Sequence, residues 1–117
     1  MSAHFHRITP FLWFDKQAEE AANHYAAIFP HSSVGKVVRY DKAAAQASGQ
    51  QEGAAMTVPF TLDGHKFVAL NGGPLFHFTP AVSFVVHCET QDEIDHYWNE
   101  LSAGGDPSAQ QCGWLSV

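Results

Sequence analysis

The sequence predicts an α+β fold made of paired βαβββ modules, of which the second is incomplete in this chain. Residues 8–14 show a buried strand pattern that leads directly into an amphipathic helix, and three further strand patterns follow that helix. The strand–cap–helix order then starts again at Ala81. We therefore expect module one at residues 7–74 and a truncated module two at residues 80–117, within a single domain over residues 1–117.

The first strand and helix organise the rest of the chain. Residues 8–14 are apolar apart from one threonine and predict a strand near 7–13, and Pro10 cannot donate to a sheet ladder, which favours an edge strand or a bulge. Asp15 is the predicted N-cap of a helix over 16–29. The apolar stripe of that helix is formed by Ala18, Ala21, Ala22, Tyr25, Ile28 and Phe29.

Three strands are predicted after the first helix, at residues 34–40, 54–62 and 65–71. Asp63-Gly64 lies between the last two strands and is the strongest two-residue hairpin signal in the chain. Residues 42–53 are small, polar and rich in glycine and glutamine, so they predict a mobile loop, with a short helical turn as the alternative.

The second copy of the pattern has fewer elements than the first. Residues 81–88 (AVSFVVHC) predict a buried strand, and residues 91–103 predict a helix with Thr90 as its N-cap and Glu93 as the capping-box partner. One weak strand candidate, residues 113–117, follows that helix.

Composition restricts the class of protein. Of the 117 residues, 45% are hydrophobic and 15% charged, which argues against disorder, and the formal net charge of -6 disfavours nucleic acid and acidic membrane surfaces as partners. No apolar run is long enough to span a bilayer, and the N-terminus lacks the order of a signal peptide. With Cys88 and Cys112 as the two cysteines, we expect reduced thiols and a cytoplasmic location.

Four segments resemble one known family. They are ITPFLWFDKQAEEAANHYAAIFP at 8–30, FTLDGHKFVALNGGP at 60–74, VSFVVHCETQDEIDHYWNEL at 82–101 and CGWL at 112–115. Together they resemble the PhnB-like branch of the vicinal oxygen chelate superfamily, often labelled 3-demethylubiquinone 3-methyltransferase-like. The resemblance implies half-barrels of the glyoxalase, bleomycin-resistance and dioxygenase type with a small-molecule cleft.

The resemblance also implies where a metal ion would be held in metal-dependent members. Ile8 and Ser83 occupy the first-strand ligand positions of the two modules, and Ala69 or Asn71 stands where a glutamate would be. Ile8 cannot bind a divalent cation and Ser83 is a poor ligand for one. We therefore expect no metal and no cofactor.

Five residues are candidates for ligand binding, and no catalytic residue can be assigned. Asn71 can donate and accept through its amide, although it can equally support the turn at Gly72-Gly73. Of the eight histidines, His87 shares a predicted strand face with Ser83 and adjoins Cys88, although a structural role is the more common one. The candidates are Trp13, Phe60, Asn71, Ser83 and His87.

Two functional hypotheses follow from these observations. The first is a metal-free small-molecule site, binding or catalytic, and the second is a metal-dependent glyoxalase- or dioxygenase-type lyase or isomerase. The methyltransferase label has no motif behind it, because Gly72-Gly73 follows a hairpin strand and Pro74 comes next. A homodimer is expected because module two lacks its final strands and a second chain can cover the open sheet edge.

Overall fold

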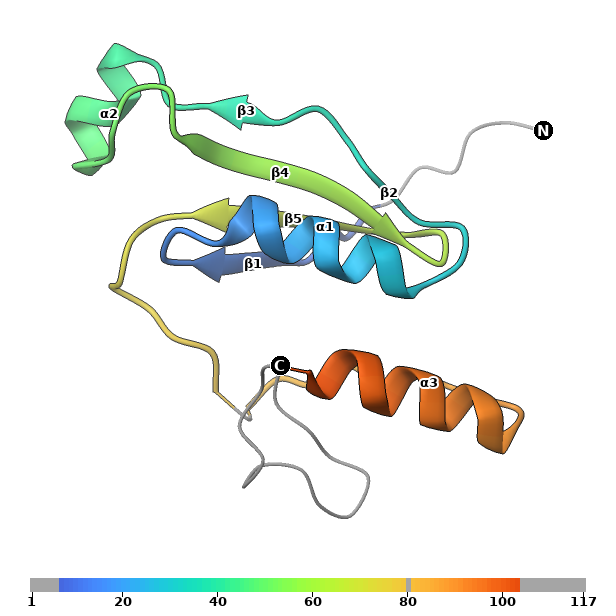
Figure 1. The fold of residues 1–117 in the computed structure, drawn as a ribbon. Coiled ribbons are helices and arrows are strands. Elements are labelled where there is room, and N and C mark those ends of the chain that lie inside the picture. Colours follow the sequence, from blue (N-terminus) through green and yellow to red (C-terminus); the bar gives the residue numbers. More distant parts are fainter. Residues whose placement is uncertain (1–6, 80, 104–117) are drawn as a thin grey trace. The chain divides into compact units, whose positions relative to one another are not determined.

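The computed structural model describes residues 7–79 and 81–103 of the chain. The chain divides into two compact units, Met1–Thr79 and Pro80–Val117. The first unit contains a five-stranded sheet and two helices, and the second contains one described helix (Figure 1). The predicted α+β class is therefore confirmed. No helix in the described ranges has the length and apolar character needed to cross a membrane.

The sheet of the first unit has the strand order β1-β5-β4-β2, with β3 also paired to β4. β1 runs parallel to β5, and β4 is antiparallel to β5, β2 and β3. β1 therefore lies at an edge of the described sheet and begins directly after Pro10, as the missing N–H of proline predicts. The strands are β1 (Phe11–Phe14), β2 (Ser33–Val34), β3 (Val38–Arg39), β4 (Ala55–Leu62) and β5 (His65–Asn71).

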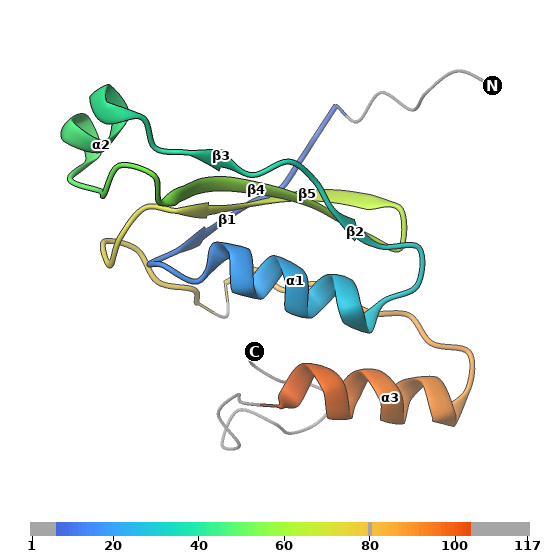
Figure 2. The same cartoon turned by 45° about the horizontal axis from the view of Figure 1, so that its top comes forward.

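Helix α1 (Ala18–Ile28) packs against one face of this sheet (Figure 2). Small side chains on the helix and the sheet meet at the centre, which lets the two layers approach closely. Ala18, Ala22, Val58 and Ala69 have no exposed surface. The buried core cluster consists of Ala18, Ala22, Ala55, Val58, Phe60 and Ala69.

The prediction that Asp15 caps α1 is wrong. The helix begins at Ala18, and Gln17 at the N-cap position makes no capping hydrogen bond with its side chain. The Ala18 N–H instead donates to Asn71 Oδ1 at 2.8 Å. Asn71 can reach the helix because it is the register partner of Phe14, so the ends of β5 and β1 lie side by side at the start of α1. A distant side chain therefore replaces the local cap.

The predicted strand over residues 34–40 is interrupted, and it appears as the two short strands β2 and β3. The Gly35 N–H donates to the Pro59 carbonyl at 2.7 Å, but Pro59 has no N–H with which to return a bond. The ladder breaks opposite this proline, and the register shifts again between Val38 and Arg39. The strands predicted at 54–62 and 65–71 agree with the structure to within a residue, whereas the strand predicted at 7–13 is observed only at Phe11–Phe14.

Helix α2 (Lys42–Ser48) occupies most of the segment predicted as a mobile loop, so the helical alternative is the correct one. Asp41 caps it, because its Oδ1 accepts from the Ala44 N–H at 2.7 Å. Gly49 ends it in the left-handed conformation with φ 73°. The alanine-rich sequence between these two caps has high intrinsic helix propensity.

The second unit has the predicted helix but not the predicted strand. α3 (Gln91–Ser102) is capped by Thr90, whose Oγ1 accepts from the Glu93 N–H at 3.2 Å. Residues 81–88 form no strand, which corrects the prediction. A strand needs a neighbouring strand, and the described part of this unit otherwise contains only a helix. The strand candidate at residues 113–117 lies outside the described residues.

Candidate functional site

The face of the sheet opposite α1 carries the other half of the alternating side chains, and we call it the open face. Phe11 pairs with Val68 and Trp13 pairs with Leu70 between β1 and β5, and these side chains point away from the α1 core. Phe11 is 60% exposed. The open face therefore presents an apolar surface within the first unit.

Four polar residues form a line across the open face, which we call the polar row: Thr9, Lys66, Thr61 and Ser33. Thr61 pairs with Ser33 on one side and with Lys66 on the other. Thr9 precedes Phe11 by two residues, and the Val68 N–H donates to the Pro10 carbonyl at 3.0 Å. Continuing the parallel register of β1 and β5 by two residues therefore places Thr9 opposite Lys66. Side chains opposite one another on adjacent strands are about 5 Å apart.

A second line runs beside the first, and we call it the apolar row: Phe11, Val68, Pro59 and Gly35. Val68 is the register partner of both Phe11 and Pro59, and Gly35 bonds to the Pro59 carbonyl. Residues two apart on a strand are separated by about 7 Å. The open face thus changes from polar to apolar over two residues along each strand.

Seven of the eight residues in these two rows, all except Phe11, line a half-open cavity of about 300 Å³, and Ser33, Gly35 and Lys66 among them are exposed. Its size lies at the lower end of the range typical for small-molecule sites. Among the described residues that line it, Lys66 is the charged one and none is a carboxylate. The cavity is lined by Thr9, Ser33, Gly35, Pro59, Phe60, Thr61, Lys66, Phe67 and Val68.

Gly35 keeps one side of the cavity free of a side chain. A Cβ atom at this position would approach Pro59 Cγ to 3.0 Å, which is tighter than ordinary packing. Any larger residue would push the Pro59 ring or occupy the cavity itself.

Trp13, a predicted site residue, lies on the open face but outside the cavity lining. Its indole Nε1 donates to the Gly73 carbonyl at 2.9 Å, and its ring meets Phe76 edge to face at a centroid distance of 4.9 Å. A Cβ atom on Gly72 would lie 2.2 Å from the indole ring, so this position requires glycine. Trp13 therefore fixes the end of β5 while presenting its ring on the open face.

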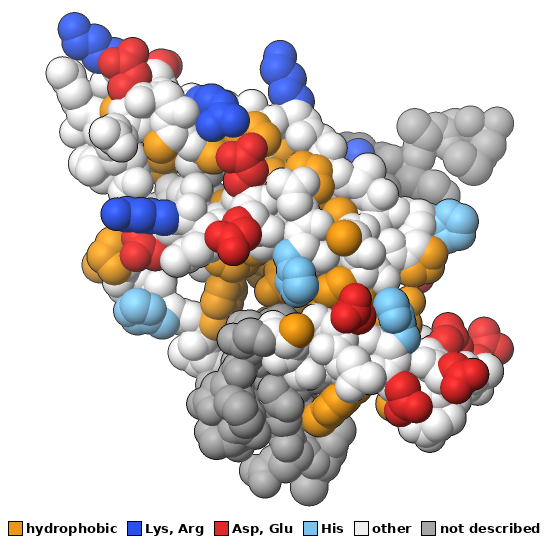
Figure 3. Space-filling model, viewed as in Figure 1, with side chains coloured by type: hydrophobic (Ala, Val, Ile, Leu, Met, Phe, Trp, Pro, Cys, Tyr) orange, Lys and Arg blue, Asp and Glu red, His pale blue; other side chains and the backbone are white. Residues whose placement is uncertain are grey.

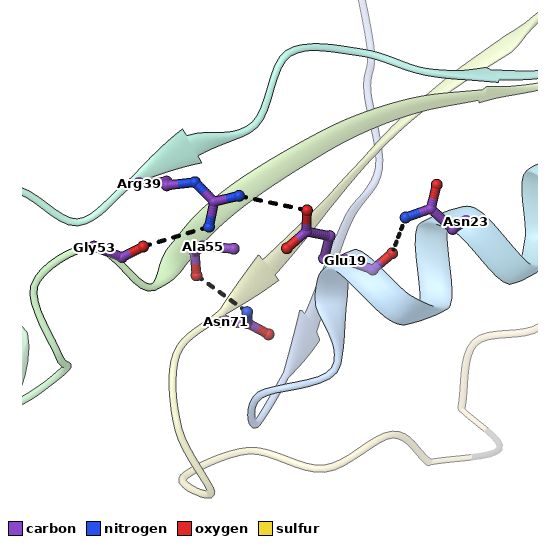
Figure 4. Close-up of polar contacts among 6 residues, drawn as sticks. All are labelled: Glu19, Asn23, Arg39, Gly53, Ala55 and Asn71. Carbon is purple, nitrogen blue, oxygen red and sulfur yellow. Dashed lines mark hydrogen bonds and ion pairs between the residues drawn. The ribbon is translucent and has the colours of Figure 1, made fainter.

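Asn71 points to the α1 face, and its side chain has two structural partners. Its Oδ1 accepts from the Ala18 N–H at 2.8 Å. Its Nδ2 donates to the Ala55 carbonyl at 3.0 Å (Figure 4). The Tyr40 hydroxyl donates to the Asn71 carbonyl. The residue is 7% exposed. Strand alternation places it on the same face as Ala69 of the α1 core, and neither residue lines the cavity.

Phe60 belongs to the buried core and also forms part of the cavity wall. It is 2% exposed and stacks on Phe67 with a centroid distance of 5.4 Å. Tyr25 of α1 stacks on its other side at 6.4 Å, and burial raises the pKa of the Tyr25 phenol. The phenol therefore stays neutral at physiological pH, as an apolar core position requires.

The other two predicted site residues, Ser83 and His87, belong to the second unit. Both are exposed and lie in the irregular segment before α3. Acidic side chains gather at the start of α3, where Asp92 and Glu93 occupy the first turn (Figure 3).

The positions at which the family resemblance implies metal ligands carry residues that are poor ligands for a metal ion. Across residues 7–79 and 81–103, no three His, Cys, Asp or Glu side chains are grouped as a metal ion would need. Ile8 is 85% exposed and Ala69 is fully buried, and neither side chain has a donor atom.

Most of the cavity residues were missed by sequence reasoning, although one signal could have found them. The two-residue turn at Asp63-Gly64 fixes the hairpin register, so Thr61 must pair with Lys66 and Pro59 with Val68. Extending that register to the flanking strands would have assembled both rows.

Comparisons with known proteins agree with this architecture. The family described as 3-demethylubiquinone-9 3-methyltransferase matches residues 6–116. The PhnB protein from Bacillus cereus, which carries the same methyltransferase name, is 35% identical, with 94% of this chain and 90% of that chain covered and a TM-score of 0.76. No curated protein matches the chain significantly.

A Staphylococcus aureus protein of known crystal structure is 27% identical, with 89% of this chain and 74% of that chain covered, and its TM-score of 0.46 adds nothing to the assignment. The family match spans nearly the whole chain, and the Bacillus cereus structure has the same fold over most of its length. The chain therefore belongs to the 3-demethylubiquinone-9 3-methyltransferase family, the PhnB-like branch of the vicinal oxygen chelate superfamily.

Proposed function

We propose that this glyoxalase-superfamily protein binds a small organic molecule in the open-face cavity, without a resident metal ion. The observation that carries the proposal is the cavity of about 300 Å³, whose wall combines apolar side chains with three hydroxyls and one ammonium group. Mostly apolar walls with a few convergent polar groups are the usual composition of a ligand site. Phe60, predicted from the sequence, forms part of that wall.

Residue chemistry supports the metal-free form of the site. The positions at which related metal enzymes hold their ion carry Ile8 and Ser83 here, and neither is a good ligand for a divalent cation. Asn71, the remaining polar candidate, uses its amide to join α1 to the sheet. We therefore leave Asn71 out of the proposed site and retain Trp13, Ser83 and His87 as candidates outside the cavity.

The methyltransferase name of the family is not proposed as the activity of this chain. A nucleotide-type cofactor is usually held by a glycine-rich loop that opens a helix. Here Gly72-Gly73 leads into a turn at Pro74 and Leu75, and no helix follows within the first unit. The glycines instead make room for the Trp13 ring.

A library of small organic molecules tests the proposal by thermal shift on the full chain. Val68→Trp fills the cavity from the apolar row, and Val38→Trp is the matched control, because Val38 pairs with Thr57 outside the cavity lining. We expect compounds that raise the melting temperature of the wild-type protein and of Val38→Trp but not of Val68→Trp. Equal shifts in all three proteins would contradict the assignment of the cavity as the site.

A further inference from the structure

Resting on the function proposed above, we infer that the ligand is a singly charged carboxylate with a flat apolar body. Lys66 and the hydroxyls of the polar row would hold the carboxylate, and the apolar row would hold the body. The inference deepens the proposed site by naming the chemical class that it selects.

The charge of the cavity points to an anion. Lys66 is the one charged side chain in the lining, in a chain whose formal charge is -6. Within the described residues, the ion pair that the structure shows is Arg39 with Glu19 at 3.5 Å (Figure 4). None of the described carboxylates is paired with Lys66. Lys66 is itself exposed, and an ammonium in the lining without a carboxylate neighbour attracts an anionic ligand.

The distribution of charge along the chain also favours an anionic ligand at the cavity of the first unit. All six Lys and Arg residues lie in the first unit, together with six of the twelve Asp and Glu residues. The first unit therefore has no formal net charge, and the second unit carries the whole -6. The first unit, taken by itself, therefore has no net formal charge that would repel an anion.

The polar row supplies hydrogen bonds on both sides of the ammonium group. Thr61 is the register partner of Lys66 in β4, and Thr9 extends toward Lys66 from the start of β1. With neighbours about 5 Å apart, one carboxylate can accept from the ammonium with one oxygen and from a hydroxyl with the other. Ser33 adds a third hydroxyl beyond Thr61.

The apolar row defines the body of the ligand. Val68 and Pro59 lie about 7 Å from the polar row along their strands, which is close to the length of one aromatic ring with its carboxylate. Gly35 leaves the space beside Pro59 open, so a flat ring system can lie over the row. A single ammonium matches a single negative charge, whereas a phosphate monoester dianion calls for more cationic donors.

Isothermal titration calorimetry with 2-naphthoate and its neutral analogue 2-naphthamide tests the inference on the full chain. Because Lys66 is exposed, we expect 2-naphthoate to bind the wild-type protein about 2- to 5-fold more tightly than 2-naphthamide, which is the usual effect of a solvent-exposed ion pair. Lys66→Gln should remove that preference by weakening 2-naphthoate alone. Lys42→Gln on α2 is the matched control and should leave both affinities unchanged.

A charge reversal gives the decisive second arm. Lys66→Glu should abolish 2-naphthoate binding and create a preference for the cation 2-naphthylmethylammonium, a gain that misfolding cannot imitate. If 2-naphthamide binds as well as 2-naphthoate and Lys66→Gln changes neither, the carboxylate inference is wrong while the cavity remains a binding site. If neither probe binds and Val68→Trp has no effect on any library compound, the proposed function itself fails.

Discussion

Asn71 connects three segments of the first unit through its own polar atoms. Its amide bonds to the first residue of α1 and to the first residue of β4, and its carbonyl accepts from the Tyr40 hydroxyl. Its side chain is buried, so each of these groups would lack water if the residue were shortened. The residue thus acts as the N-cap of α1 from the end of the neighbouring strand β5.

Asn71→Ala should lower the free energy of unfolding by about 2–4 kcal/mol, because it leaves the Ala18 N–H and the Ala55 carbonyl unpaired. Urea denaturation followed by far-UV circular dichroism measures the change. Asn23→Ala is the matched control, since its amide makes one exposed bond to the Glu19 carbonyl (Figure 4). A loss for Asn71→Ala no larger than that of the control would contradict this role.

Sequence reasoning identified Asn71 as the important polar residue but could not assign its role. Its partners are 53 and 16 residues away in the chain, and no local pattern reveals such distances. The same limit explains the wrong prediction for Asp15. This residue has the type and position of a helix cap, but the contact of α1 with the distant residue Asn71 replaces it.

The elements that the sequence predicted well are those that local chemistry defines. The Asp63-Gly64 turn fixes the β4–β5 hairpin, and Thr90 with Glu93 defines the start of α3. The α2 segment was undervalued because glycines and glutamines surround it, although Asp41 and Gly49 provide caps at both ends. Local signals of this kind act over a few residues. They therefore predict that a helix or strand exists better than they predict which strand it pairs with.

Elements whose existence depends on a partner were harder to predict. Residues 34–40 have strand composition, but Pro59 on the neighbouring strand interrupts their ladder. Residues 81–88 have strand composition as well, yet they form no strand in the structure. The cavity is missed for the same reason, because it arises from the register of four strands rather than from any one of them.

At the scale of the whole molecule, exposed apolar side chains mark a surface that a second chain can cover. Val82 is 72% exposed and Val85 71% exposed, in a segment of β-branched and aromatic residues. Such segments readily add to a sheet edge of another molecule. We therefore predict that the protein is a homodimer, which a two-fold related copy forms with one self-complementary surface.

Sedimentation equilibrium at micromolar concentration should give about twice the chain mass of 12.8 kDa. Val85→Glu should shift the protein toward the monomer because it introduces a charge into the apolar contact. Asp95→Ala on α3 serves as the control for an acidic, exposed position. A mass of one chain that stays constant over a hundredfold range of concentration would contradict the dimer.

The location of the binding site on the open face can be measured directly. Backbone amide chemical shifts of the ¹⁵N-labelled full chain, recorded during titrations with 2-naphthoate and 2-naphthamide, report which residues meet the probe. We expect the largest changes at the cavity residues Thr9, Ser33, Thr61, Lys66 and Val68, and unchanged amide shifts in α2. If neither probe moves these five resonances, or if the changes fall only on residues outside the cavity, the claim is contradicted.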